Sequence, residues 1–470
     1  MTQPLAIHWF RQDLRLSDNP SLFHACQQGT ILPIYILDDT NAKKHYLGAA
    51  SRLWLHHALE SLDQSLEKHL SLYKGDPLSI LVKLCDCYGI KSIFWNRCYE
   101  PWRISRDTEI KKTLESKGIS VNSFNSSLLW EPWNITKDNG TPYKVFTPFY
   151  KKGCLKAPSP RKPLPQPQKM DLYKDSKGAI ELGALGLLPI KRWDDQIQVK
   201  WKMSESGAQQ RLSIFLKNGI SNYKEGRNLP AKPYVSKLSP YLHFGQISPN
   251  QVWYKAKDLG HNADIDHFCS ELGWREFSYS QLYFNPHLPE KNLQNKFDAF
   301  PWKNTPEHLL AWQKGQTGIP FVDAGMRELW KTGYMHNRLR MVVGSFLVKN
   351  LMLHWQHGES WFWDCLLDAD LASNSASWQW VAGCGADAAP YFRIFNPVTQ
   401  AQKFDPNGIY IRKYVPEIQN LPDKYLFSPW EAPNEILTDA GVVLGDNYPK
   451  PIVNLQASRQ EALQAFDSLR

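Results

Sequence analysis

Short apolar runs alternate with helical patterns over residues 1–130, and this alternation constrains the fold more than any other feature of the chain. Strands separated by helices favour a parallel sheet, because a parallel connection needs a crossover that is usually helical. The expected helices are Ala49–His69 and Pro77–Tyr88. The expected strands are Ala6–Phe10, Ile31–Leu37, Leu70–Tyr73, Ser92–Trp95 and Val121–Phe124. We therefore predict an N-terminal α/β domain with a Rossmann-like parallel sheet.

The pattern changes to long amphipathic helices, interrupted by Ser-Pro pairs, from about Met203 onward. We therefore expect an all-α domain over residues 203–470 and a linker over residues 131–202. That linker contains the basic, proline-rich run Lys156–Pro167, which is typical of a surface segment. No Gly-x-Gly-x-x-Gly motif follows the first predicted strand, so the sequence does not support a nicotinamide site there.

The composition fits a folded protein of two or three domains, with 470 residues, 42% of them hydrophobic and 21% charged. No apolar run is long enough to span a bilayer, and the N-terminus has no signal-peptide pattern. We therefore expect a cytoplasmic monomer, associated with the nucleoid if the source is a bacterium. The eight cysteines follow no metal-ligand or disulfide pattern, so we expect free thiols and no metal site.

The net charge of +9 is unevenly distributed. Residues 1–200 hold 28 Lys and Arg against 20 Asp and Glu, whereas residues 201–470 hold 27 against 26. The overall charge is therefore weak evidence for DNA binding. Residues 331–350 are more informative, because they contain basic residues and no acid, which predicts a surface that faces phosphates. Their basic residues are Lys331, Arg338, Arg340 and Lys349.

The stretch Asp368–Pro397 carries the most unusual combination of side chains in the helical half. If its first part is helical, Asp370, Asn374 and Trp378 recur at i, i+4 and i+8 and share one face. An apolar core would not select Asp and Asn, because each needs a hydrogen-bond partner when buried. The spacing leaves two interpretations open: a site for a polar, planar ligand, or a solvated face that also carries tryptophan.

Two segments, Tyr223–Arg227 and Tyr234–Tyr241, form a polar, basic loop that leads into a helix. Ser239 and Pro240 are predicted to be the N-cap and first-turn residues of that helix, whose free amides could bind a diphosphate. The alternative is an ordinary helix start, because Ser-Pro begins many helices.

Four motifs in this chain resemble the photolyase/cryptochrome family, in the family's order and over nearly the whole length. They are His8–Asn19, Glu271–Phe277, Tyr334–Met341 and Asp368–Pro397. The resemblance is to the cyclobutane pyrimidine dimer photolyases of class I or class III. It implies an antenna-binding N-terminal domain, a helical FAD-binding domain, and the activity of a deoxyribodipyrimidine photo-lyase. In that reaction, reduced FAD donates an electron to a pyrimidine dimer in UV-damaged DNA under light, and the dimer splits.

The resemblance also implies the FAD contacts. The residue at position 374 faces the flavin N5 in the family, and Asn there can bond a protonated N5 without adding charge, which favours reduced flavin. The alternative is an Asn that caps or bonds back to its own helix. Val235-Ser236 stands where the family has Thr-Ser, so one hydroxyl contact is expected to be missing. The implied contacts are Tyr223, Arg227, Ser236, Lys237, Leu238, Ser239, Arg340, Asp368, Ala369, Asp370 and Asn374, with Arg340 expected to pair with one of the two acids.

The DNA-facing residues implied by the resemblance suit a dimer, because they offer aromatic faces, polar groups for pyrimidine edges, and cations for phosphates. The family's (6-4) enzymes have His where this chain has Asn337 and Met341. The implied residues are Glu271, Trp274, Arg275, Asn337, Arg338, Met341, Trp380 and Lys403.

Ten of the 19 tryptophans lie between residues 253 and 380, a density that usually means aromatic core packing. The resemblance selects three of them, Trp302, Trp355 and Trp378, as an electron-transfer path between the flavin and the surface. We call these three residues the tryptophan triad.

The antenna pigment and the rival functions are the least constrained predictions. The turn Asn96–Pro101 ends a predicted strand, where α/β sheets place ligands. The sequence of Ser377–Pro390 resembles that of the class III members of the family. This resemblance favours 5,10-methenyltetrahydrofolate as the antenna pigment, with 8-hydroxy-5-deazaflavin as the alternative. The main rival function is a cryptochrome-type blue-light sensor, against which Asn374 and the absence of a long C-terminal extension argue. A more distant rival is a nucleic-acid-binding flavoprotein oxidoreductase.

Overall fold

The computed structural model describes residues 5–191, 193–388 and 392–469, so part of the Asp368–Pro397 stretch and of Ser377–Pro390 lies outside the described residues. Contacts divide the chain into two compact units. Unit 1 comprises Met1–Lys217, Ser236–Pro286 and Leu367–Ala372. Unit 2 comprises Asn218–Val235, His287–Leu366 and Ser373–Arg470.

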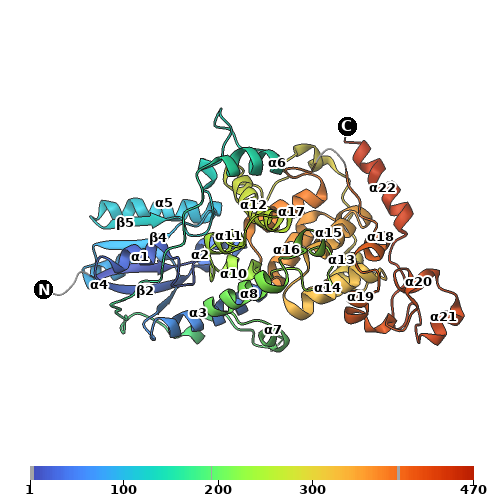
Figure 1. The fold of residues 1–470 in the computed structure, drawn as a ribbon, viewed down its shortest axis with the longest axis horizontal. Coiled ribbons are helices and arrows are strands. Elements are labelled where there is room, and N and C mark those ends of the chain that lie inside the picture. Colours follow the sequence, from blue (N-terminus) through green and yellow to red (C-terminus); the bar gives the residue numbers. More distant parts are fainter. Residues whose placement is uncertain (1–4, 192, 389–391, 470) are drawn as a thin grey trace. The chain divides into compact units, whose positions relative to one another are not determined.

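The N-terminal part of unit 1 is a five-stranded parallel sheet in the order β3-β2-β1-β4-β5 (Figure 1). The inner strands β1, β2 and β4 are mostly apolar because helices cover both faces of the sheet, and side chains such as Ile7, Ile34 and Ile93 are fully buried. The predicted fold class and all five predicted strands are therefore confirmed. The strands are β1 Leu5–Phe10, β2 Thr30–Leu37, β3 Ser71–Lys74, β4 Ser92–Asn96 and β5 Ser120–Phe124.

The two helices predicted from the sequence differ in how well their ends were located. Helix α4 is Pro77–Tyr88, as predicted, because Asp76 caps its start and Gly89 ends it with a φ of 64°. Helix α3 is Ala49–Ser65 and ends four residues before the predicted His69. The reason is a turn in which Glu67 and Lys68 adopt positive φ, a conformation that nothing in their residue types signals.

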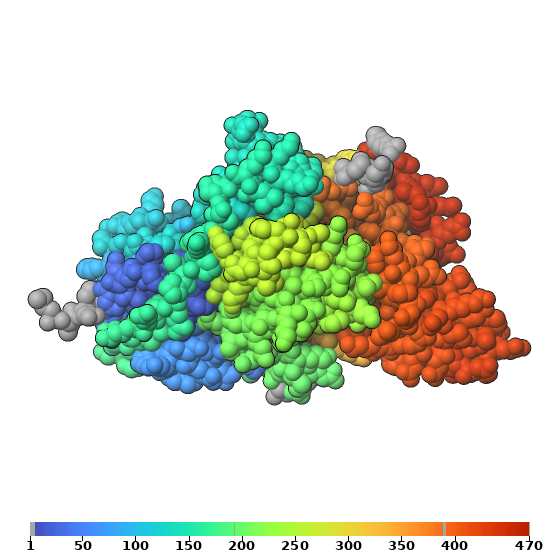
Figure 2. Space-filling model, in the orientation of Figure 1, coloured from blue at the N-terminus to red at the C-terminus, as the bar shows by residue number. Residues whose placement is uncertain are grey.

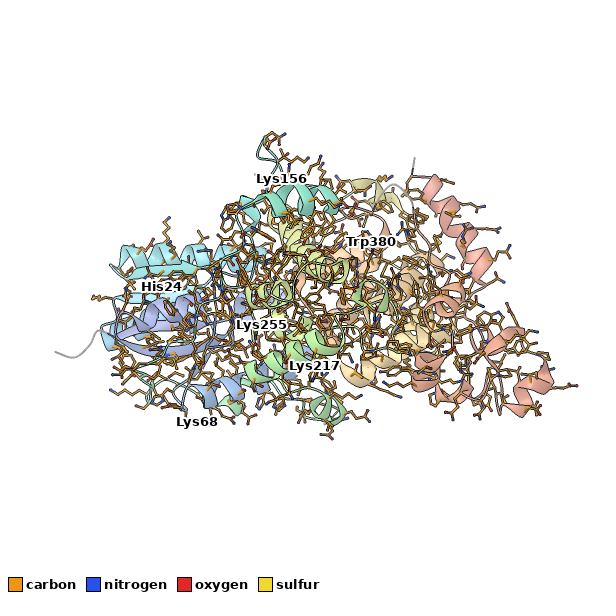
Figure 3. The ribbon with its side chains drawn as sticks, in the orientation of Figure 1. His24, Lys68, Lys156, Lys217, Lys255 and Trp380 are labelled. Carbon is orange, nitrogen blue, oxygen red and sulfur yellow. The ribbon has the colours of Figure 1, made fainter. Side chains whose placement is uncertain are left out.

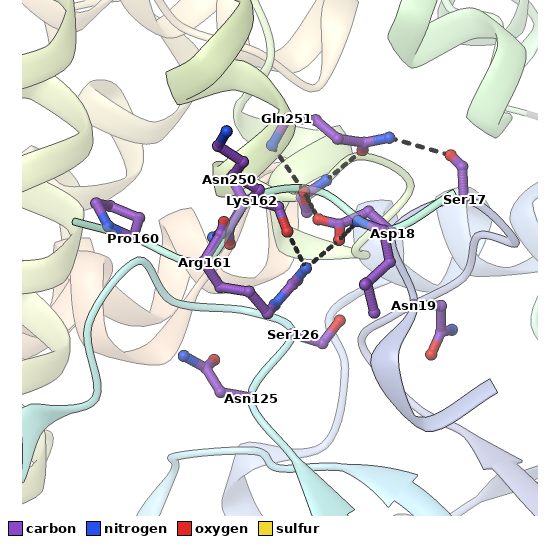
Figure 4. Close-up of polar contacts among 12 residues, drawn as sticks. Ser17, Asp18, Asn19, Asn125, Ser126, Pro160, Arg161, Lys162, Asn250 and Gln251 are labelled. Atoms are coloured by element: carbon purple, nitrogen blue, oxygen red, sulfur yellow. Dashed lines mark hydrogen bonds and ion pairs between the residues drawn. The ribbon is translucent and has the colours of Figure 1, made fainter. Parts of the chain in front are cut away.

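The proline-rich segment is anchored to unit 1 by hydrogen bonds (Figure 4). The buried Asp18 accepts from Arg161 at 2.6 Å and from the Leu164 amide at 2.8 Å. Asn250, on α11 (Pro249–Lys257), donates to the Arg161 carbonyl at 2.6 Å. Further along, Leu172 bridges to Ile31 of β2. This part of the predicted linker therefore lies at the surface but in one defined conformation.

Helices make up the parts of the chain that carry most of the predicted site residues. None of the helices in the described ranges is long and apolar enough to cross a membrane. In unit 1 the main site helix is α12, Ala263–Phe284. In unit 2 the site helices are α14 Pro320–Thr332, α15 Asn337–Ser345, α16 Trp355–Cys365, α17 Leu371–Ala382 (its residues 373–382) and α18 Pro397–Phe404.

Candidate functional site

The acids Asp368 and Asp370 are both buried in unit 1, with 8% and 7% exposure. Asp370 accepts a hydrogen bond from the hydroxyl of Tyr279 on α12, and His243 Nδ1 lies 3.8 Å from its carboxylate. Burial alone would raise the pKa of Asp370, but His243, Arg275 and the Tyr279 hydrogen bond outweigh it and hold that pKa well below its ordinary value. Asp370 is therefore a fixed negative charge. Sequence reasoning missed Tyr279, because a tyrosine inside a helix resembles ordinary core.

Asn374, in unit 2, has its amide orientation fixed by Glu359 on α16. Its Nδ2 donates to the Glu359 carbonyl at 3.1 Å and to Glu359 Oε1 at 3.0 Å. Because both partners are acceptors, the nitrogen must face them. No residue that the structure describes donates to Asn374 Oδ1, and its side chain does not bond back to α17. The interpretation of Asn374 as a back-bonding helix residue is therefore wrong, and Oδ1 can accept from a ligand N–H.

The tryptophan triad is gathered around α16 in unit 2. The His354 ring lies 5.0 Å from the Trp302 ring and 5.5 Å from the Trp355 ring, measured between centroids. Trp378 packs against Gly358 so closely that a Cβ there would lie 2.1 Å from its ring. Trp355 is fully buried, and its indole N–H donates to Asn292 Oδ1 at 2.8 Å. Sequence reasoning missed His354 and Asn292.

Two of the predicted phosphate-facing residues of unit 2 pack their cationic groups against the same aromatic ring, that of Phe404. The Arg338 guanidinium lies 4.2 Å from the Phe404 ring centroid, and Lys403 Nζ lies 5.3 Å from it. Arg338 also donates to Asn228. Asn337 is exposed, whereas Met341 and Trp380 are partly buried (Trp380 is labelled in Figure 3).

The prediction that Lys349 faces phosphates is wrong. Its side chain is 1% exposed, its Nζ donates to the Ala382 carbonyl at 2.7 Å, and it lies 2.9 Å from the centroid of the Phe392 ring. Burial lowers the pKa of Lys349 well below its ordinary value. The acid-free run predicted a surface because charge patterning does not report which residue of a helix faces inward.

The DNA-facing residues predicted in unit 1 lie along α12. Trp274 stacks on Phe146 with centroids 3.8 Å apart and an 11° interplanar angle. Glu271 lies 3.7 Å from His267 one turn earlier. Arg275 donates to the Ser127 carbonyl at 2.6 Å. In Figure 2 the surface of residues 137–156 (teal) borders that of α12 (yellow-green), in agreement with the Phe146 contact.

The predicted diphosphate loop is divided between the two units. In unit 2, Tyr223 is buried and the Arg227 guanidinium lies 5.7 Å from its ring centroid. Arg340 donates to the Met335 carbonyl at 2.8 Å, and its pairing with an acid stays a prediction. In unit 1, Ala369 is buried and the Ser236 hydroxyl accepts from the Leu238 amide at 3.4 Å.

The predicted N-cap role of Ser239 is wrong. Helix α10 is Ser239–His243, and its N-cap is Leu238, which makes no side-chain capping bond. Ser239 is therefore the first helical residue. Lys237, just before the cap, adopts a φ of 53°, so the chain turns into the helix one residue earlier than the Ser-Pro signal indicates.

A small cavity lies at the carboxyl ends of β1 and β2 in unit 1. The strand order reverses beside β1, and the carboxyl edge at such a reversal is where open α/β sheets bind ligands. Aromatic rings and cations meet there: the Arg106 guanidinium lies 5.1 Å from the ring centroids of both Trp9 and Trp102. The cavity is lined by Trp9, Arg11, Tyr35, Ile36, Leu37, Asp38, Asp39, Ala42, His45, Tyr46, Leu47, Trp102, Arg103 and Arg106. Its α5 residues (Pro101–Ser116) directly follow the predicted Asn96–Pro101 turn.

Comparison with known proteins assigns the chain to a family. Residues 6–168 match the model described as DNA photolyase, and residues 268–468 match the model described as the FAD binding domain of DNA photolyase. A deoxyribodipyrimidine photo-lyase from Agrobacterium fabrum is 44% identical over 100% of this chain and 98% of that relative. The chain belongs to the DNA photolyase family. The matched FAD-binding domain makes FAD the cofactor of this photolyase-family chain.

Two solved photolyase structures and a plant relative place the chain within the family. The class III photolyase from Agrobacterium tumefaciens superposes with a TM-score of 0.95 at 44% identity, covering 100% of this chain and 98% of that one. The archaeal photolyase from Sulfolobus tokodaii with two FAD molecules superposes with a TM-score of 0.84 at 29% identity, covering 99% and 100%. Cryptochrome-1 of Arabidopsis thaliana is more distant, with 35% identity over 99% of this chain and 70% of that relative.

Proposed function

We propose that this chain splits cyclobutane pyrimidine dimers in UV-damaged DNA with light, through reduced FAD. The observation that carries the proposal is the geometry of Asn374. The amide nitrogen of Asn374 donates both of its hydrogen bonds to Glu359. The side-chain atom left for a ligand is therefore Oδ1, which is an acceptor. A protonated flavin N5 donates a hydrogen bond, whereas the unprotonated N5 of oxidised flavin accepts one, so Oδ1 favours the reduced cofactor.

The residues present fit FAD chemically. Asp370 is a fixed carboxylate and can accept from ring N–H or ribose hydroxyl groups, and Asp368 is a second buried acid. Arg227 and Arg340 supply cations for the diphosphate, and Ser236 and Ser239 supply hydroxyls. When bound, FAD supplies the light-driven one-electron donation; the chain's own residues hold it and orient it.

For the substrate we propose a division of roles among the DNA-facing residues. Trp274 and Trp380 present aromatic faces to the pyrimidines, Glu271 and Asn337 hydrogen-bond their edges, and Met341 gives an apolar contact. Arg275 contributes through its charge, since its side chain is bonded to Ser127 and Glu276. Arg338 and Lys403, which both contact Phe404, bind backbone phosphates.

The tryptophan triad is proposed to reduce the cofactor. Electrons move from Trp302, which is partly exposed, through Trp355 to Trp378, which is buried. The ring contacts that His354 makes with the first two, and the packing of Trp378 on α16, support this order.

We propose that the cavity at the carboxyl ends of β1 and β2 holds the antenna pigment. Trp9 and Trp102 offer flat faces to a planar chromophore, and Arg106, which is ion-paired with Asp38, lies against both rings. Both 5,10-methenyltetrahydrofolate and 8-hydroxy-5-deazaflavin meet these requirements, and we retain the folate as the first choice. The absorption spectrum of the purified protein distinguishes the two.

The test of the main proposal is repair of defined lesions. The reduced protein under blue light should restore DNA that contains a thymine cyclobutane dimer and leave DNA with a (6-4) photoproduct unchanged, because Asn337 and Met341 stand where (6-4) enzymes have His. Repair of the (6-4) lesion would overturn the substrate assignment. Repair of neither lesion, with normal flavin photoreduction, would favour the cryptochrome-type sensor.

A further inference from the structure

One side of α15 runs from the proposed lesion contacts at the surface into the core of unit 2. Asn337, Met341, Ser345 and Lys349 recur at intervals of four residues, and in this order they pass from exposed through partly buried to fully buried. An α-helix turns by about 100° per residue, so residues twelve apart would drift by about 120°. The wider π-helical turn at Phe346–Asn350 rotates less per residue, which reduces this drift and keeps Lys349 near the side that bears Asn337 and Met341.

The two buried members of this series connect α15 to the segments on either side of it. Lys349 Nζ donates to the carbonyl of Ala382, the last residue of α17, at 2.7 Å, and lies 2.9 Å from the centroid of the Phe392 ring. The Ser345 hydroxyl accepts from the Phe395 amide at 3.1 Å. An amine donates to a carbonyl whether or not it is protonated, so the first contact does not depend on the charge of Lys349. Helix α15 is therefore joined both to the end of α17 and to the chain that leads into α18.

These two segments carry other proposed DNA contacts. Trp380 lies in the last turn of α17, and its carbonyl accepts from the Gly383 amide at 3.2 Å. Asn396 caps the start of α18, the helix that carries Lys403, by accepting from the Val398 amide at 2.9 Å. Because one helix holds both segments, the lesion contacts on α15 keep a fixed spacing from those on α17 and α18.

The packing around Lys349 leaves its amine little room to move. Gly383 adopts a φ of 98°, and a Cβ added there would lie 3.3 Å from Lys349 Nζ and 3.2 Å from the Phe392 ring. Phe392 in turn stacks on Phe466 of α22 (Leu455–Asp467), with centroids 4.3 Å apart and an interplanar angle of 7°. A buried amine costs free energy that an apolar side chain of similar size would avoid. Stability alone therefore does not account for a lysine at this position.

We propose that Lys349 and Ser345 are positioning residues that fix the spacing of the lesion pocket and so set its preference for a pyrimidine dimer over undamaged bases. This inference rests on the proposed function and on the DNA-facing roles proposed for Asn337, Met341 and Trp380. A dimer is a rigid pair of linked rings, so only walls held at one spacing contact both rings at once. A phosphate contact tolerates a small shift, because lysine and arginine side chains are long and flexible.

The test is binding in the dark, by the FAD-loaded protein, of two duplexes that differ only in one thymine dimer. Lys349→Met keeps a long unbranched side chain but removes the N–H donor. It should raise the Kd for dimer DNA several-fold and leave the Kd for undamaged DNA and the flavin absorption spectrum unchanged. Ser345→Ala removes only the acceptor for the Phe395 amide and should act in the same direction. Lys296→Met is the matched control, because exposed Lys296 contacts Phe466 with its Nζ 5.1 Å from the ring centroid; both Kd values should stay unchanged.

The outcomes distinguish this inference from the proposed function. Lys349→Met should melt near the wild-type temperature, because no buried charge is left without its partner. If it melts far lower, Ser345→Ala decides by the same ratio of Kd values. A wild-type ratio in the folded variants, or an equal loss of affinity for both duplexes, would overturn the inference and leave the proposed function in place. A wild-type protein with no preference for dimer DNA would overturn the proposed function, and the inference with it.

Discussion

Two buried carboxylates on or beside α12 have pKa values that their surroundings shift in opposite directions. Asp370 keeps its charge because His243, Arg275 and Tyr279 stabilise the anion against burial. Glu276 accepts from the Leu129 amide at 2.9 Å and the Trp130 amide at 3.2 Å, yet burial raises its pKa to about 7. Environment rather than residue type therefore decides the direction in which each pKa moves.

The raised pKa of Glu276 makes the stability of the protein depend on pH. The folded state holds the Glu276 proton more tightly than the unfolded chain does. The stabilisation that results is complete below the ordinary pKa of 4.5 and is lost as pH rises through about 7. Glu276→Gln keeps an oxygen for the two amides and cannot ionise. As pH rises from the ordinary pKa to about 7, the free energy of unfolding of the wild-type protein should fall relative to that of the variant, by at most about 1.4 kcal/mol per pH unit. Urea unfolding at a series of pH values measures this, and parallel curves would contradict it.

Helix α16 is the element that organises unit 2 around the proposed cofactor contacts. It carries Trp355, supplies Glu359 to Asn374, and presents Gly358 to the ring of Trp378. Gly358 is necessary because its Cα lies where any side chain would enter that ring.

Replacing that glycine should damage α16 more than its helix propensity suggests. Gly358→Ala would raise the intrinsic helix preference but force Trp378 out of place, for a net loss of about 1–3 kcal/mol from overpacking. Gly344→Ala is a matched control, because its added Cβ would lie 3.2 Å from Val381, which can move slightly. Thermal unfolding should rank Gly358→Ala below Gly344→Ala, with photoreduction also slowed only in the first. Equal stability of the two variants would show that the Trp378 ring can move aside.

The elements also show what a sequence can and cannot predict here. The strands were located within one residue, and the inner strands β1, β2 and β4 are mostly apolar because they are buried on both faces. The bond partners of Asn374, Asp370 and Trp355 were not predicted, since Glu359, Tyr279 and Asn292 are distant in sequence and of unremarkable type. Lys349 was misplaced for a related reason: one turn of a helix decides between surface and core, and its neighbours give no periodic signal that it faces inward.

At the scale of the whole molecule, the charge that binds DNA is expected to be local rather than global. The net charge of +9 comes mostly from residues 1–200, whereas Arg338 and Lys403 lie in the nearly neutral remainder. Long-range attraction by exposed lysines is screened within about 10 Å at ordinary salt, so only cations that touch phosphates should set the salt dependence of binding.

Arg338→Ala tests this expectation in the whole protein. It should weaken binding to dimer-containing and undamaged DNA alike and reduce the slope of log affinity against log salt by about one phosphate contact. Lys112→Ala removes one exposed charge from the α/β part and should leave that slope unchanged. Glu271→Ala should instead reduce mainly the preference for damaged DNA, because a carboxylate reads a pyrimidine edge and repels phosphate. Titrations of both DNAs at several salt concentrations measure all three variants. An unchanged slope in Arg338→Ala would show that its guanidinium, held between Phe404 and Asn228, does not face the backbone.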